Sequence, residues 1–245
     1  MTEAVCTRSE ARPLLSVITT TDPETRCLPR LIQALAYLAE GNDWEQEIII
    51  VDDLKQWADR DEARAFSETH TRPGTKVITL WYPEHQGQMA ALYCGLRMSS
   101  GQAILTLDPD LYTSVDAIPN MLDQWRSGYL LVHGCRLERP HLGPIRRVGT
   151  SLANGLVRRI TALPVHDLGS PVTLFCASMK PVLNTLPDGI SNGRLYAYSL
   201  HRDQLCEVCI PAEAEQARKS HYHLANLIPV FLNLALQAWR VRRLT

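Results

Sequence analysis

The 245-residue sequence has no excess of charge of either sign, because 25 lysines and arginines stand against 26 aspartates and glutamates. Bulk positive charge therefore does not point to a nucleic-acid partner or to an anionic membrane. The sequence also lacks internal repeats, low-complexity tracts and a Gly/Ser linker, which favours one large domain. It opens with neither a basic nor an apolar segment, so we expect no secretory signal and a cytoplasmic protein.

Two kinds of phosphate loop are missing. Neither G-x-x-x-x-G-K nor G-x-G-x-x-G occurs, so a kinase or a dinucleotide oxidoreductase would lack its usual phosphate cradle. A nucleotidyltransferase would need a basic glycine-rich loop after the first strand, and residues 19–26 contain no glycine. Of seven cysteines only Cys206 and Cys209 have C-x-x-C spacing, and on a strand their sulfurs would point to opposite faces. We interpret them as packing residues rather than a metal or redox site.

Short apolar runs alternate with segments that have apolar residues at helical spacing. This order predicts an α/β fold with a mostly parallel, Rossmann-like sheet that is covered by helices on both faces. The predicted strands are residues 14–18, 47–51, 76–80 and 103–107, and the predicted helices are residues 29–38, 59–69 and 88–98.

Acidic residues follow two of the predicted strands. Asp52 and Asp53 follow the second strand, and Asp108 and Asp110 follow the fourth, on either side of a proline. Ligands of open α/β sheets bind beyond the carboxyl ends of the strands, so both pairs can share one crevice. Aspartate also caps helices and makes turns, which would explain either pair alone. The two pairs together, in a fold of this order, favour a binding site.

Two carboxylates one residue apart suit a hard divalent cation, Mg²⁺ or Mn²⁺, that phosphate oxygens also hold. Such a cation stabilises the charge that grows on a nucleoside diphosphate as it leaves. Asp108 and Asp110 are thus the candidate metal ligands, and Asp52 or Asp53 would accept hydrogen bonds from a base or ribose. This division of roles predicts a nucleotide-sugar transferase.

One longer motif carries a family likeness, residues 100–111, which read Ser-Gly-Gln-Ala-Ile-Leu-Thr-Leu-Asp-Pro-Asp-Leu. Further motifs lie at residues 87–92, 95–96, 118–119, 125–129, 132–139, 154–156, 167–170 and 219–222. In this order, over residues 14–235, the sequence resembles the family 2 glycosyltransferases of GT-A fold. Within that family it is most similar to the polyprenyl-phosphate branch, which includes dolichol-phosphate mannose synthase and undecaprenyl-phosphate aminoarabinose transferase.

The resemblance implies an inverting, metal-assisted transfer of a sugar from a nucleoside diphosphate sugar to a polyprenyl phosphate or a related small acceptor. In this family the acceptor is already anionic, so its oxygen attacks the anomeric carbon without a strong general base. The implied catalytic residues are Asp110, Asp167 and Arg136. The implied nucleotide-binding residues are Thr20, Thr21, Asp22, Asp52, Asp53, Gln88 and Asp108. The implied phosphate or acceptor residues are Arg139, Ser170, Lys219 and His221.

Arginine suits such a site because the guanidinium group matches phosphate with two parallel hydrogen bonds. For Arg136 and Arg139 a surface ion pair is the alternative. For His221 the alternative is an ordinary exposed histidine.

The sequence departs from the family pattern at several site positions. Leu54 lies in a turn that usually contains glycine, and Tyr112 replaces a glutamine whose amide oxygen can bind the metal. Glu215 and His221 stand where an arginine and a lysine are usual. One interpretation is a working transferase with an altered donor or acceptor, and the other is a non-catalytic GT-A module that binds nucleotide or lipid as a partner subunit. We favour the transferase because the acidic residues expected at the site are present.

Residues 222–239 are largely apolar and lead into Arg240, Arg242 and Arg243. Asparagine, glutamine and proline interrupt the run, which favours an interfacial or core-packing helix over a membrane span. Such a helix could lie on the inner face of the membrane, or dock on a membrane partner or a second copy of the chain. The predicted division is an N-terminal extension (1–13), a GT-A domain (14–219) and an amphipathic helix with a basic end (220–245).

Overall fold

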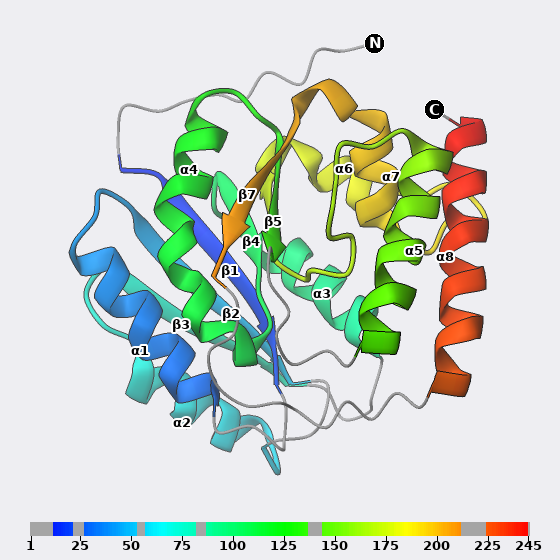
Figure 1. Cartoon of the computed structure of the whole chain (residues 1–245). Helices are drawn as coiled ribbons and strands as arrows, with labels where there is room; N and C mark the ends of the chain where they lie inside the picture. Colours follow the sequence, from blue (N-terminus) through cyan, green and yellow to red (C-terminus); the bar gives the residue numbers. More distant parts are fainter. Residues whose placement is uncertain are drawn as a thin grey trace.

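A computed structural model describes residues 12–21, 27–52, 57–81, 87–136, 144–211 and 224–244. It contains a seven-stranded sheet with helices on both faces (Figure 1). The strands are β1 (Leu14–Thr20), β2 (Glu45–Asp52), β3 (Thr75–Trp81), β4 (Ala103–Thr106), β5 (Leu131–Arg136), β6 (Thr173–Cys176) and β7 (Leu205–Ile210). The α-helices are α1 (Cys27–Glu40), α2 (Arg60–His70), α3 (Gln88–Met98), α4 (Ile118–Arg126), α5 (Pro144–Thr161), α6 (Lys180–Asn184), α7 (Gly193–Leu200) and α8 (Leu224–Leu244). The 3-10 helices are η1 (Pro109–Ala117), η2 (Ala177–Met179) and η3 (Arg202–Gln204).

The predicted alternation of strands and helices in the first half of the chain is confirmed. The first three predicted strands lie within β1, β2 and β3, and the predicted helix at residues 88–98 coincides with α3. The fourth predicted strand is one residue too long, because β4 ends at Thr106 and η1 begins at Pro109. Asp108 is therefore the residue that leads directly into η1.

The sheet order is β3-β2-β1-β4-β6-β5-β7, and β6 is antiparallel to both of its neighbours. Since β4 and β5 are each antiparallel to β6, they run in the same direction and end at the same edge of the sheet. The chain enters β6 from that same edge, after residues 167–172. The topology thus brings together the end of β4, the end of β5 and the turn before β6.

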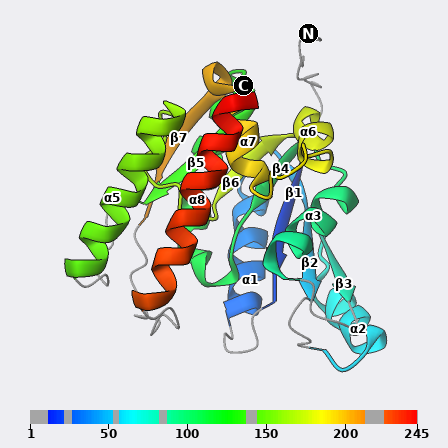
Figure 2. The same ribbon diagram turned by 90° about the vertical axis from the view of Figure 1, so that its right-hand side faces the viewer.

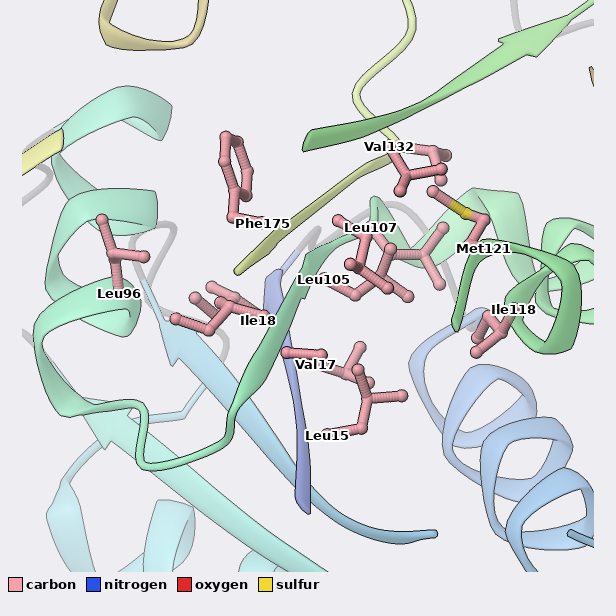
Figure 3. Close-up of a cluster of buried hydrophobic side chains, with 14 of the residues drawn as sticks. Leu15, Val17, Ile18, Leu96, Leu105, Leu107, Ile118, Met121, Val132 and Phe175 are labelled. Atoms are coloured by element: carbon pink, nitrogen blue, oxygen red, sulfur yellow. The ribbon is translucent and has the colours of Figure 1, made fainter. Parts of the chain in front are cut away.

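The strands are largely apolar, as expected for a sheet that helices cover on both faces. Ile18 points toward Leu96 and Phe175 on the face covered by α3, whereas Leu15 and Val17 point to the opposite face (Figure 3). This alternation of neighbouring side chains is the ordinary period of a strand. The core therefore consists of two apolar layers separated by the sheet.

Gly95 allows α3 to approach the sheet closely. A Cβ atom at this position would overlap the Cγ2 atom of Ile18, so a larger residue would push α3 away from β1. Because α3 starts at the edge where β1 and β4 end, this close contact fixes one wall of the site described below.

The predicted C-terminal helix is present as α8, which lies beside α5 (Figure 2). Gln237 is buried on its inner side, where its amide nitrogen donates to Gly189 O (3.2 Å) and its amide oxygen accepts from Ser191 N–H (3.0 Å). These bonds attach α8 to the loop before α7. The predicted boundary between residues 219 and 220 lies outside the described residues.

Candidate active site

Asp108 occupies the N-cap position of η1, but its side chain makes no capping hydrogen bond. Asp59 shows the contrasting behaviour at α2, because its carboxylate accepts hydrogen bonds from the backbone N–H groups of Asp61 and Glu62 at 3.0 and 2.9 Å. A helix-capping role therefore accounts for Asp59 and does not account for Asp108. The Asp108 side chain lies instead in the wall of a cavity.

This cavity, hereafter the Asp110 cavity, has a volume of about 340 Å³ and lies between η1, α3, β6 and the start of α7. Its described lining has a polar side and an apolar side. The polar side chains are Thr106, Asp108, Asp110, Arg136, Asn192 and Arg194. The larger apolar ones include Met89, Leu92, Leu96, Phe175 and Leu183. A cavity with a few convergent polar groups in an apolar setting is the usual form of a small-molecule site.

Asp110 has an unfavourable electrostatic environment for a negative charge. Burial raises the pKa of its carboxyl group, and the nearby charge of Arg136 lowers that pKa only in part. A carboxylate with a raised pKa in a cavity indicates a functional position, since a bound cation would favour its charged form. Among the described residues, no three His, Cys, Asp or Glu side chains gather into a metal site. The described lining thus offers two carboxylates, which fits a Mg²⁺ or Mn²⁺ ion that substrate phosphates complete.

Asp167 holds Arg136 in the wall of the Asp110 cavity. The Arg136 Nε–H group donates to Asp167 Oδ2 at 2.8 Å, and Nη2 lies 3.4 Å from Oδ1. The Asp167 side chain is 4% exposed and that of Arg136 is 19% exposed. In this structure Asp167 positions the Arg136 guanidinium group through these hydrogen bonds, and the catalytic role that the family resemblance implies for Asp167 stays a prediction.

A buried hydrogen-bond network holds the backbone of Asp167. His133 Nε2–H donates to Asp167 O at 2.7 Å, and Nδ1 accepts from the Tyr198 hydroxyl group at 2.8 Å, which also contacts Thr173 Oγ1. Burial lowers the pKa of His133 to about 3, and the charges of Arg194 and Arg136 add to this effect. The neutral ring therefore supplies one donor and one acceptor, as the two contacts require.

Arg194 is a site residue that the sequence reasoning missed. Its Nη2 group donates to Leu168 O at 2.7 Å, and its Nη1 group donates to Ser170 O. Ser170, a predicted acceptor-binding residue, is fully buried, and its Oγ accepts from Val172 N–H at 3.3 Å. The sequence did contain one signal for Arg194. This residue lies in the first turn of α7, where a positive charge is unfavourable because it opposes the helix dipole.

The predicted nucleotide-binding residues Thr20, Thr21 and Asp52 lie at the ends of β1 and β2. Asp52 is fully buried, with Oδ1 accepting from the Thr21 hydroxyl group (2.8 Å) and Oδ2 accepting from Trp57 N–H (3.2 Å). None of the three belongs to the described lining of the Asp110 cavity. The structure thus brings Asp108, Asp110 and Arg136 together and gives Asp52 a separate set of contacts.

Several predicted site residues lie outside the described residues, and their roles stay predictions. Gln88 begins α3, but its side chain is also outside the described part. Tyr112, one of the departures from the family pattern, is partly buried against the core. The other residues in question are Asp22, Asp53, Leu54, Arg139, Glu215, Lys219 and His221.

Two solved structures of glucosyl-3-phosphoglycerate synthase from Mycobacterium tuberculosis share this fold. The complex with uridine diphosphate has a TM-score of 0.64 and 17% sequence identity, covering 92% of this chain and 80% of that one. The complex with Mn²⁺, uridine diphosphate and glucosyl-3-phosphoglycerate has a TM-score of 0.63 and 16% identity, covering 94% and 80%. These identities show the shared GT-A fold alone.

Sequence comparison extends the likeness to the family. The chain is 28% identical over 224 residues to undecaprenyl-phosphate 4-deoxy-4-formamido-L-arabinose transferase of Pseudomonas aeruginosa (strain LESB58), and the match covers 90% of this chain. It spans 64% of the length of that relative. Residues 16–176 match the family described as Glycosyl transferase family 2. Because this match covers most of the sequence, the chain belongs to glycosyl transferase family 2, as its motifs predicted.

Proposed function

We propose that this chain transfers a sugar from a nucleoside diphosphate sugar to a polyprenyl phosphate or a related small phosphorylated acceptor, with inversion at the anomeric carbon. The observation that carries the proposal is the Asp110 cavity, which is lined by two carboxylates and by a guanidinium group that a buried aspartate holds in place. Family membership and the name of the Pseudomonas relative support the reaction and the acceptor class.

Asp108 and Asp110 would hold a divalent metal ion, and their hard oxygen ligands suit Mg²⁺ or Mn²⁺. Such an ion, when bound, offsets the negative charge that develops on the departing nucleoside diphosphate. The Mn²⁺ and uridine diphosphate in the mycobacterial synthase complex support this assignment.

Arg136 is the described residue best placed to meet a phosphate oxygen across the cavity from these acids. Its guanidinium group is already oriented by Asp167, so little conformational entropy is lost when a ligand binds. In the transfer, an acceptor phosphate oxygen forms a bond to the anomeric carbon while the bond from that carbon to the diphosphate breaks. The acceptor contributes the electron pair of an existing anion, so the site needs no side chain to remove a proton.

A panel of UDP-, GDP- and dTDP-sugars with Mn²⁺ tests the proposal. We expect one donor to raise the melting temperature and to be hydrolysed slowly without acceptor, and faster transfer when decaprenyl phosphate is added. 3-Phosphoglycerate serves as the soluble comparison. The control is Asp116→Asn, because Asp116 is exposed on η1, the same helix as Asp110. No response to any donor at millimolar concentration would contradict the transferase and favour the non-catalytic GT-A module.

The outer side of α8 supports association with a membrane surface. None of the helices in the described part of the chain is long and apolar enough to cross a bilayer. On α8, however, Leu236 and Trp239 are 44% and 46% exposed, and Arg243 lies 3.9 Å from the centre of the Trp239 ring. Exposed aromatic and basic side chains on one helix suit the headgroup region of an anionic bilayer. A peripheral position on the inner face of the membrane would follow.

Flotation with liposomes that contain anionic lipid tests this association. Replacing both Leu236 and Trp239 by serine should reduce the bound fraction severalfold and lower the melting temperature only modestly, because both side chains are already partly exposed. Tyr37→Ser is the matched control, since Tyr37 is 80% exposed on α1, away from α8 (Figure 1). Equal flotation of all three proteins would contradict the membrane surface. If the molecular mass of the protein in solution increases with its concentration, association of two copies through α8 is favoured instead.

A further inference from the structure

Arg194 combines a position in the lining of the Asp110 cavity with hydrogen bonds to backbone carbonyl oxygens. Its acceptors are Leu168 O and Ser170 O, which carry no net charge. No described carboxylate forms an ion pair with it. By contrast, Arg136, its neighbour in the Asp110 cavity, has its charge offset by Asp167. Arg194 therefore brings to the cavity a positive charge that is not held in an ion pair with any described carboxylate.

The position of this charge is costly in two ways. Arg194 is only partly exposed, and partial burial of a guanidinium group without an anionic partner is unfavourable. It also lies in the first turn of α7, which contains no acidic residue, so it opposes the helix dipole. A residue that serves only to hold the 168–170 turn would not need a charge in this position.

The charge of Arg194 acts on the groups around it. It lowers the pKa of His133, which burial already lowers to about 3. It also opposes the rise that burial causes in the pKa of Tyr198 and of Tyr93, another residue of the cavity lining. The charge of Arg194 thus acts on three titratable groups from three elements, of which Tyr93 lines the cavity.

We propose that Arg194 binds a phosphate group of the substrates, either on the acceptor or on the nucleoside diphosphate. This inference rests on the proposed function and adds a second guanidinium group to the site. Arg194 uses two of its five N–H donors on Leu168 O and Ser170 O, so the plane of the group is fixed before a ligand arrives. A planar group with fixed orientation and spare donors matches the oxygens of a phosphate.

The experiment measures dissociation constants for three ligands with wild-type protein and variants. Geranyl phosphate represents the acceptor phosphate, UDP with Mn²⁺ represents the diphosphate, and uridine is the uncharged comparison. In Arg194→Gln we expect binding of one phosphate ligand to weaken about 10- to 100-fold, the range of one charge-assisted hydrogen bond, with uridine unchanged. Arg240→Gln is the matched control, because Arg240 also donates to a backbone carbonyl, Gly189 O (2.8 Å), outside the cavity.

Each outcome is decisive. Weaker geranyl phosphate binding alone places Arg194 at the acceptor phosphate, and weaker UDP binding alone places it at the diphosphate. If both constants stay within twofold of wild type, or if uridine and Arg240→Gln are affected equally, the proposal is wrong and Arg194 only supports the turn. If Arg194→Gln does not fold, Arg194→Lys replaces it. Because lysine offers a single ammonium group, binding of the phosphate ligand should weaken about three- to tenfold. An unchanged dissociation constant would overturn the proposal. Wild-type protein that binds neither phosphate ligand contradicts the proposed function itself.

Discussion

The ends of β2 and β4 carry the same kind of side chain at the same edge of the sheet, but their environments are opposite. Asp52, at the end of β2, is fully buried and accepts hydrogen bonds from Thr21 and Trp57. Asp108 and Asp110, after β4, line a cavity. Asp52 thus holds neighbouring segments of the chain together, whereas Asp108 and Asp110 are placed where a ligand can reach them. An aspartate after a strand is thus identified as a site residue when its carboxylate lines a cavity, and as a structural residue when hydrogen bonds from the chain surround it.

The largest expected effect comes from Asp110→Asn, which should lower the rate of sugar transfer about a thousandfold. Loss of a metal ligand removes several kcal/mol of charge stabilisation, and each 1.4 kcal/mol corresponds to a factor of ten. The raised pKa of Asp110 means that its charged form destabilises the folded state as pH rises from 3.8 through that pKa. Asp110→Asn removes this penalty, so its urea midpoint at pH 7 should equal or exceed that of wild type.

Both readouts of this variant are needed. Asp116→Asn, on the same helix but exposed, should keep the wild-type rate and the wild-type midpoint. A normal transfer rate in Asp110→Asn would remove Asp110 from the site. A large fall in the midpoint would mean that Asp110 behaves like Asp52, as a structural residue, and the contrast between the two strand ends would disappear.

Arg136→Met should lower the free energy of unfolding by about 3 kcal/mol, because it leaves the buried carboxylate of Asp167 without its cation. Transfer should fall as well, since Arg136 faces the Asp110 cavity. Equilibrium urea unfolding measures the first effect. Arg64→Met is the control, because the exposed pair of Arg64 with Glu68 should contribute less than about 0.5 kcal/mol.

A double-mutant cycle shows whether the loss of stability in Arg136→Met comes from its contact with Asp167. With Asp167→Asn in the background, Arg136→Met should be much less destabilising, because no unpaired charge remains buried. Additive effects of the two changes would show that the Arg136–Asp167 contact does not stabilise the fold, and Asp167 would no longer be a positioning residue.

The third effect depends on pH and comes from His133. Its pKa is about 3 in the folded protein and 6.5 in the unfolded chain, so below pH 6.5 the unfolded state takes up a proton that the folded state does not. The contribution of neutral His133 to the free energy of unfolding is therefore fully present above pH 6.5 and is lost as pH falls toward 3. Between pH 7 and pH 5 the loss from this residue should be about 2 kcal/mol. Urea unfolding at several pH values should show a shallower acid limb for His133→Gln.

Tyr198→Phe separates this titration from the hydrogen bond that accompanies it. The variant removes the hydroxyl group that donates to His133 Nδ1 but leaves the buried ring in place. It should lose about 1 kcal/mol at every pH and keep the wild-type dependence on pH. If His133→Gln keeps the steep acid limb, other groups cause it and His133 is not buried in its neutral form.

Only part of the fold could be predicted from the sequence. Continuous apolar runs between amphipathic segments were sufficient for β1 to β3 and for α3, because burial on both faces leaves a clear pattern. The antiparallel direction of β6 was not predictable, since a four-residue strand with three apolar residues carries no signal of its direction. That direction matters, because it brings the turn before β6 to the edge where β4 and β5 end.

The same limit applies to the site. Asp108 and Asp110 were predicted because they follow a strand whose end faces the expected crevice, and Arg136 was predicted from the family resemblance. Arg194 lies 58 positions after Arg136 and reaches the cavity through the packing of α7, which no local pattern encodes. Asp52 resembles Asp108 in sequence, and only the placement of Thr21 and Trp57 around it distinguishes the two.

The last prediction concerns the β2 end and tests its assignment directly. Thr21→Val keeps the shape of the side chain but removes the hydroxyl group that donates to Asp52 Oδ1, so stability should fall by about 1.5 kcal/mol. Binding of UDP with Mn²⁺, measured by calorimetry, should change less than threefold if Thr21 acts only on Asp52. Thr69→Val, an exposed threonine on α2, should change neither quantity. Unchanged stability with tenfold weaker UDP binding would instead place Thr21 in contact with the nucleotide, and both strand ends would then belong to one substrate site.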